Sequence, residues 1–252
     1  NGIKVVVRPS TLKADEVIIY ATAKGGKSML SDADYFHGDY LAMVMQQSGI
    51  SKFSATELAK QLSGKSAHAS VGVGAYEHAV NASGSPKDIE TILQLMYLNF
   101  TAPRFDETDL QNLKNMYVPY FRNMEADPGY LMGKAFQETL YQNHVRRQAT
   151  SAAQIESLNL ETLASVHKQL FSYADDFRFV IAGNVDLNTL KPLVEKYIGS
   201  LPTSKKVEYA VVDDGVRTAT GKVTNDFRVA MQQPKVSVYL TFTGDIEDNA
   251  KN

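Results

Sequence analysis

The segment FRFVIAGNVDLNTLKPLVEKYIGSLP, residues 177–202, holds the clearest structural signal in this sequence. Its first six residues are rich in β-branched and aromatic side chains, which predicts a strand over residues 177–182. The turn sequence Gly-Asn-Val-Asp comes next, and residues 187–198 are expected to form a helix that ends at Gly199. A strand that leads directly into a helix indicates a fold that combines a sheet with helices.

The beginning of the chain predicts two more strands and a helix. Residues 3–8 and 16–22 are rich in β-branched side chains and are expected to be strands. Between residues 34 and 48, apolar side chains recur at helical spacing. Gly49 lies directly after them and is a typical stop signal at a helix C-terminus.

A short helix and a hairpin are predicted next. Ser54 and Glu57 have the spacing of a capping box, in which each side chain bonds to the backbone N–H of the other residue. Alternating apolar side chains at residues 67–73 and 76–82 predict two strands, and the intervening Gly74 indicates a turn between them.

The middle of the chain predicts a run of helices. They are expected from Ser85 onward, at residues 106–122 with a bend at Pro119, at residues 129–141 and at residues 159–171. Runs of strands followed by runs of helices predict an α+β fold, with a mainly antiparallel sheet and helices packed on one of its faces.

The character of the sequence changes after Pro202. Residues 203–225 are polar and are expected to be a linker, whereas residues 227–243 are again strand-rich and loosely repeat the pattern of the first strands. We therefore expect one domain over residues 1–202 and the truncated start of a second, similar domain over residues 226–252.

Composition excludes several classes of function. The chain has 252 residues, no cysteine and a net charge of −2, with 26 basic and 28 acidic residues. Thiol nucleophiles and thiolate metal sites are therefore absent, and the charge balance argues against a nucleic-acid partner. No apolar stretch is long enough to span a bilayer.

Three stretches resemble the pitrilysin/insulinase family of zinc peptidases, which includes the processing peptidases. The most specific covers residues 179–186 together with 193–202, and residues 1–7 and 52–58 add weaker matches. The resemblance implies the LuxS/processing-peptidase-like metallohydrolase fold for residues 1–202.

Family members carry an inverted zinc motif, H-x-x-E-H, on their first helix, and its two histidines bind zinc while its glutamate activates water. Alignment on Gly49 places Tyr40 and Val44 at the ligand positions and Met43 at the position of the base. None of these side chains can perform those roles. His37 is the one histidine of this helix, which contains no glutamate.

The resemblance therefore implies a non-catalytic domain from the second half of such a peptidase. It would form scaffold and substrate-chamber wall for a zinc-bearing half outside this chain, with a peptide as substrate and no catalytic or metal-binding residue of its own. The alternative is a purely structural or assembly subunit of the same fold with no active partner half. A peptidase-like framework without cysteine also favours the bacterial periplasm or cell envelope.

The other histidines are candidates for a metal or catalytic site. His68 and His78 lie on neighbouring predicted strands, with Glu77 adjacent, so an unrelated enzyme could use these three side chains. Strand alternation points Glu77 away from His78, which favours ordinary surface or core histidines. His144 lies in a loop that commonly carries His-Pro in the family and is expected to be structural.

Overall fold

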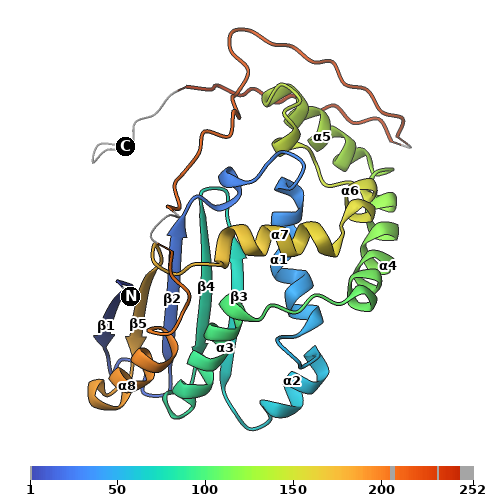
Figure 1. The fold of residues 1–252 in the computed structure, drawn as a ribbon. Coiled ribbons are helices and arrows are strands. Elements are labelled where there is room, and N and C mark those ends of the chain that lie inside the picture. The colour runs from blue at the N-terminus through green and yellow to red at the C-terminus, as the bar shows by residue number, and fades with distance from the viewer. Residues whose placement is uncertain (1, 205–207, 232, 245–252) are drawn as a thin grey trace. The chain divides into compact units, whose positions relative to one another are not determined.

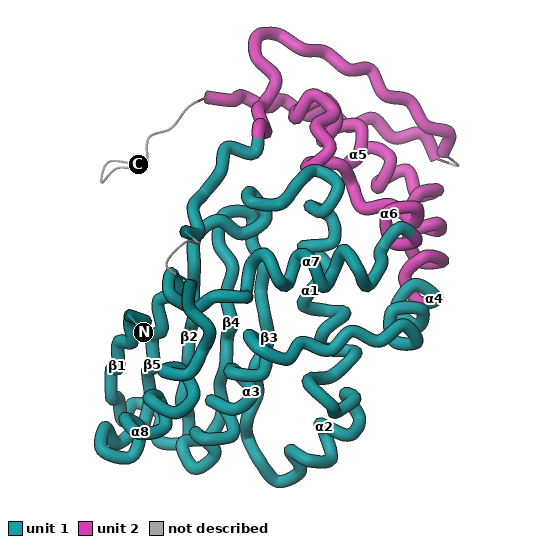
Figure 2. Tube along the Cα trace, viewed as in Figure 1, with its two compact units in different colours: residues 1–115, 157–214 teal, residues 116–156, 215–252 magenta. Residues whose placement is uncertain are grey.

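A computed structural model describes residues 2–204, 208–231 and 233–244. Two compact units interleave along the sequence (Figure 2). Unit 1 consists of residues 1–115 and 157–214, and unit 2 consists of residues 116–156 and 215–252. The chain thus leaves unit 1, returns to it and leaves it again.

Unit 1 is built on a five-stranded sheet (Figure 1). The strands are β1 (Lys4–Pro9), β2 (Val17–Lys24), β3 (Ala67–Val73), β4 (Glu77–Gly84) and β5 (Arg178–Gly183). Their spatial order is β1-β5-β2-β4-β3, because the last strand inserts between the first two. β1 and β5 run parallel and all other neighbours run antiparallel, which confirms the expected mainly antiparallel sheet.

Helices cover one face of this sheet. They are α1 (Tyr35–Ser48), α3 (Ile89–Thr101), α7 (Leu160–Phe171) and α8 (Leu187–Tyr197), whereas α2 (Ala55–Gln61) packs on α1; η1 (Gly26–Met29) and η2 (Pro86–Asp88) are short 3-10 helices. α3 packs on β3 and β4, and α1 packs on β3 and α7. The side chains of β2 alternate accordingly. Val17, Ile19 and Ala21 point toward the helices and are fully buried, while Tyr20 points to the other face and is 48% exposed.

The core between sheet and helices is rich in phenylalanine. Phe100 of α3 lies 4.9 Å from Phe177, measured between ring centroids, and Phe171 of α7 lies 6.2 Å from the same ring. All three rings are at most 4% exposed. Burial of large aromatic side chains contributes most of the apolar area in such a core, so these rings hold the helices onto the sheet.

Unit 2 contains the end of α4 (Glu107–Met124), α5 (Pro128–Leu140), η3 (Val145–Arg147) and nearly all of α6 (Ala152–Ser157). Asp127 caps α5 by accepting the backbone N–H of Gly129 at 2.8 Å, and Pro128 occupies the first turn, where proline is tolerated. Glu125 accepts the backbone N–H of Ala152 at 2.7 Å and so joins the end of α4 to the start of α6.

The sequence predicts most elements within a few residues, and the α+β fold class is confirmed. Three expectations differ from the structure. Helix α6 is not among the predicted elements, and the expected helix from residue 106 extends to Met124, with Pro119 inside it and the bend there still a prediction. The described part of residues 227–243 forms no strand, because strands require a hydrogen-bonding partner that this segment does not have. The domain boundaries at residues 202 and 226 stay a prediction.

Across the described residues, no helix combines the length and apolarity that a bilayer crossing requires.

Candidate functional site

The residues aligned with the zinc motif lie on α1 and are used for packing. Val44 is 1% exposed and Met43 is half-buried. Tyr40 is also half-buried, and its ring centroid lies 4.9 Å from that of Phe36, one turn earlier. The positions that would hold two ligands and a base thus carry a phenol, an aliphatic side chain and a thioether, none of which is among the His, Cys, Asp and Glu side chains that typically bind zinc.

The C-terminus of α1 is fixed by Gly49. Its φ of 89° is strained for any residue with a side chain, and a Cβ there would lie 2.3 Å from the carbonyl oxygen of Phe53. The glycine therefore sets where α1 ends and the register of the residues aligned with the motif.

His37, the one histidine of α1, holds two helices together. Its Nε2 lies 3.2 Å from Nδ2 of Asn159, the N-cap residue of α7. Oδ1 of Asn159 accepts the backbone N–H of Thr162 at 2.8 Å, so the amide nitrogen faces His37 and donates to it. Burial lowers the pKa of His37, which keeps the ring neutral and able to accept that bond.

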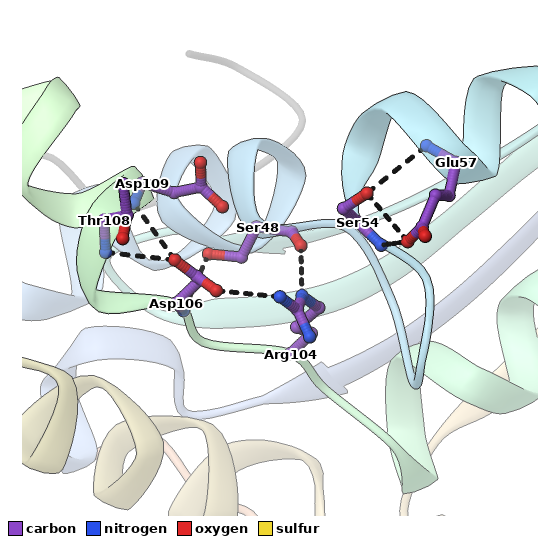
Figure 3. Close-up of polar contacts among 7 residues, drawn as sticks. All are labelled: Ser48, Ser54, Glu57, Arg104, Asp106, Thr108 and Asp109. Atoms are coloured by element: carbon purple, nitrogen blue, oxygen red, sulfur yellow. Dashed lines mark hydrogen bonds and ion pairs between the residues drawn. The ribbon is translucent and has the colours of Figure 1, made fainter.

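A polar network joins the end of α1 to the start of α4 (Figure 3). Arg104 donates through Nε to the carbonyl oxygen of Ser48 at 2.8 Å and through Nη2 to Oδ2 of Asp106 at 2.7 Å. The hydroxyl oxygen of Ser48 accepts the backbone N–H of Asp106 at 3.1 Å. Asp106 in turn caps α4 by accepting the backbone N–H of Thr108 at 3.0 Å. A cation at a helix C-terminus is also favoured by the helix dipole.

The predicted capping box is confirmed beside this network (Figure 3). The backbone N–H of Ser54 donates to Glu57 at 2.9 Å, and the backbone N–H of Glu57 donates to the hydroxyl of Ser54 at 3.3 Å. The hydrogen bonds that Glu57 accepts from Ser54 lower the pKa of its carboxyl group. Ion pairs and caps therefore account for the charged groups around the end of α1 without invoking a ligand.

His68, Glu77 and His78 do not converge. His68 is exposed and lies opposite Ser83, whereas His78 is 1% exposed and lies opposite Val73, five residue pairs along the hairpin. At about 3.4 Å per residue, the two histidines are about 17 Å apart along the strands. The two rings also point to opposite faces of the sheet, so no joint metal site forms.

The two remaining histidines also have structural contacts. Nε2 of His167 lies 2.8 Å from the carbonyl oxygen of Asn99 in the core of unit 1. In unit 2, Nδ1 of His144 accepts the backbone N–H of Arg146 at 3.2 Å and caps η3. Within the described residues, no group of three or more His, Asp or Glu side chains could hold a metal ion.

Part of the predicted linker is docked on unit 1, which sequence reasoning missed. We call residues 208–214 the strap. The backbone N–H of Tyr209 donates to Oδ2 of Asp176 at 2.7 Å, and that of Val212 donates to Oγ of Ser28 at 3.0 Å. Tyr209 is 5% exposed, and burial raises its pKa to about 12. The sequence signal available for this docking was the aromatic residue Tyr209 inside an otherwise polar stretch.

Tyr209 covers the buried His78. The two ring centroids are 4.8 Å apart in an edge-to-face arrangement, and Phe171 and Phe177 pack on the same imidazole at 5.3 and 5.1 Å. Nδ1 of His78 accepts the backbone N–H of Gly26 at 3.2 Å. Burial lowers the pKa of His78 to about 4, and the backbone of Leu170 offsets this only in part. The site is a neutral, aromatic-lined anchor for the strap.

Comparison with known proteins shows which proteins this chain is similar to. Residues 157–251 match the model described as the peptidase M16 inactive domain. The probable zinc protease PqqL of Haemophilus influenzae is 20% identical over 97% of this chain and 26% of its own length. The probable zinc protease PqqL of Escherichia coli is 23% identical over 81% of this chain and 22% of its own length. The chain thus spans about a quarter of these relatives.

Solved structures share the fold. The periplasmic protease PqqL of Escherichia coli superposes with a TM-score of 0.74 over 87% of this chain and 24% of its own, at 21% identity. A peptidase M16 inactive domain from Pseudomonas fluorescens gives 0.62 over 82% of this chain and 50% of its own, at 17% identity. The resemblance to pitrilysin/insulinase-type zinc peptidases is thereby confirmed, and residues 157–251 of this chain are similar to the peptidase M16 inactive domain.

Proposed function

We propose that this chain is scaffold and substrate-chamber wall for a zinc-bearing half that lies outside residues 1–252. The main support for the proposal is the set of side chains that α1 carries at the aligned motif positions. Tyr40, Met43 and Val44 occupy the aligned motif positions, and the one histidine of the helix bonds to Asn159 instead of a metal. The chain also spans only 22–26% of its curated relatives, which leaves ample length for a catalytic half in a protein of that kind.

The proposal also includes a cofactor, a substrate class and a cellular compartment. The relatives are named zinc proteases, so zinc belongs in the proposed catalytic half, and the substrate is a peptide. The Escherichia coli relative is described as a periplasmic protease, which supports the periplasm or cell envelope of a bacterium for this protein.

Residues 226–252 are proposed to begin a second, similar domain. In the described part of this segment, apolar side chains alternate and are largely exposed: Val236 is 89% exposed, Val238 78%, Leu240 82% and Phe242 93%. Alternation of this kind suits a strand with one buried face. Extending the chain should therefore protect residues 234–243 from protease, and equal cleavage with and without the extension would contradict the proposal.

Complementation tests the proposed function. The proposed half with H-x-x-E-H would be purified with and without residues 1–252, and zinc-dependent hydrolysis of a denatured protein would be measured. We expect hydrolysis only when both parts are present. Chelator-sensitive turnover by residues 1–252 alone would refute the proposal, and a neighbouring sequence without H-x-x-E-H would favour the purely structural subunit.

A further inference from the structure

The face of the sheet that the helices leave uncovered carries apolar side chains in register. Val6 of β1 lies beside Val180 of β5, and Val180 lies beside Tyr20 of β2. They are 60%, 39% and 48% exposed, respectively. We call this side of the sheet, formed by the residues that alternate with the buried ones, the open face. The row runs from the edge strand β1 to the central strand β2, and exposed apolar patches are a feature of interaction surfaces.

Cations flank this apolar row and no acidic side chain accompanies them. Lys4 and Arg178 are register partners on one side of the row, and Arg8 lies on the other. The three register rows that start at Lys4, Val6 and Arg8 contain neither aspartate nor glutamate. None of these three cations forms an ion pair with another residue in the described part of the chain.

This arrangement places like charges side by side. Lys4 and Arg178 are register partners on the parallel strands β1 and β5, and both side chains are exposed. One row further along, Lys24 lies opposite Glu77, so the same sheet does place opposite charges together elsewhere. Neighbouring like charges without an acidic partner break a local rule of protein design, and such exceptions are expected at functional surfaces.

The side chains of the open face indicate which kind of partner it can bind. Guanidinium and ammonium groups bind carboxylates, and arginine can do so through two parallel hydrogen bonds. The tyrosine and valine side chains between the cations offer contact area to apolar side chains. An extended chain that carries both acidic and apolar residues therefore matches the row better than a uniformly charged polymer does.

We propose that the open face binds acidic stretches of unfolded polypeptide that also carry apolar side chains. The role as peptide-facing wall rests on the proposed function, whereas the binding itself needs only this chain. The proposal narrows the substrate from any peptide to one whose negative charge is complementary to Lys4, Arg8 and Arg178.

Fluorescence anisotropy tests the proposal with the chain of residues 1–252. The probes are a labelled peptide with alternating glutamate and leucine or tyrosine, the same peptide with lysine in place of glutamate, and a single-stranded oligonucleotide of equal charge. We expect the acidic peptide to bind about tenfold more tightly than the lysine peptide. Its affinity should fall when salt is raised from about 50 to about 300 mM, because exposed charges are screened.

Charge reversal locates the binding surface. Lys4→Glu with Arg178→Glu should weaken acidic-peptide binding about tenfold or more. Lys52→Glu with Lys87→Glu makes the same charge change at exposed positions off the open face and should leave binding unchanged. Equal binding of both peptides, or equal effects of both variants, would overturn the proposal, and so would an oligonucleotide that competes as well as the acidic peptide.

A neutral variant guards against a folding artefact. Lys4→Gln with Arg178→Gln removes the repulsion, so Tm should rise while peptide affinity falls. Unchanged affinity would refute the proposal. If the chain binds the peptide but does not restore activity to the zinc-bearing half, only the proposed function is contradicted. If it restores activity but does not bind the peptide, only this inference is contradicted.

Discussion

The ring of Tyr209 lies edge-to-face over the ring of His78, with 4.8 Å between their centroids. His78 belongs to the sheet of unit 1 and Tyr209 to the strap, 131 residues later in the chain. The contact therefore ties the segment that leaves unit 1 to strand β4 of its sheet. The strap is thus held on unit 1 by a buried aromatic side chain in addition to the backbone hydrogen bonds of Tyr209 and Val212.

Stability should fall as the pH is lowered from neutrality. The pKa of His78 is about 4 in the folded protein and about 6.5 when unfolded, so the unfolded chain binds more protons between these values. The stabilisation is complete above about pH 6.5 and is lost as the pH falls toward 4, by roughly 3 kcal/mol at 1.36 kcal/mol per pKa unit. Urea unfolding between pH 7 and 5 measures the upper part of this loss, before most carboxylates titrate.

Two substitutions show whether His78 causes this dependence. His78→Gln should flatten the dependence of unfolding free energy on pH in that window, apart from the smaller contributions of His37 and His167, whose pKa values burial also lowers. His68→Gln changes an exposed histidine and should leave the slope as it is. Identical slopes in both variants would refute the assignment.

Removing the ring of Tyr209 should release the strap. We expect Tyr209→Ala to reduce the free energy of unfolding by about 3 kcal/mol, as is usual for truncation of a buried aromatic residue. It should also raise the pKa of His78 toward 6.5, because water then reaches the imidazole. NMR titration of the histidine and chemical denaturation measure both effects. Tyr209→Phe keeps the ring and should cost less than about 1 kcal/mol, and a similar loss in the two variants would contradict the role of the ring as an anchor.

The bond between His37 and Asn159 should be separable from helix capping. Asn159→Ala removes both the cap and the donor to His37, and should cost about 1–3 kcal/mol. Asn159→Asp keeps an oxygen for the N–H of Thr162 but places a carboxylate beside the imidazole. We therefore expect Asn159→Asp to raise the pKa of His37 in an NMR titration. An unchanged pKa would show that the two side chains do not interact in solution.

Arg104 should matter more than an exposed arginine with the same kind of partner. Arg104→Ala leaves the carbonyl oxygen of Ser48 and the carboxylate of Asp106 without their donor, and we expect a loss of about 1–3 kcal/mol in unfolding free energy. Arg228 pairs with Asp226 at 3.0 Å, but both side chains are largely exposed, so Arg228→Ala should change stability by less than about 1 kcal/mol. Equal losses would mean that the network in Figure 3 contributes no more than a surface ion pair.

Local sequence signals predict the elements of this fold well and their long-range partners less well. The capping box at Ser54 and Glu57 and the stop at Gly49 depend on neighbours a few residues away, and both are present. The place of β5 between β1 and β2 depends on pairing across most of the unit, which periodicity does not encode.

The same limit applies to the candidate site. The proposed substitution of the zinc motif rests on residues 40–44 alone, because it concerns residue types at a fixed spacing, and it stays a prediction. The bond from Asn159 to His37 and the anchor of Tyr209 on His78 cannot, because each joins residues more than 100 positions apart. Composition places Tyr209 in a linker, although its ring is buried.

Zinc stoichiometry is the sharpest test of whether this chain is a non-catalytic domain. The purified chain of residues 1–252 would be equilibrated with zinc, freed of loosely bound metal by dialysis, and its metal content measured by mass spectrometry. We predict well below one zinc per chain, because Tyr40, Met43 and Val44 are not among the usual zinc ligands and His37 is engaged by Asn159. One retained zinc per chain, lost on His37→Ala substitution, would contradict the assignment of this chain as a non-catalytic domain.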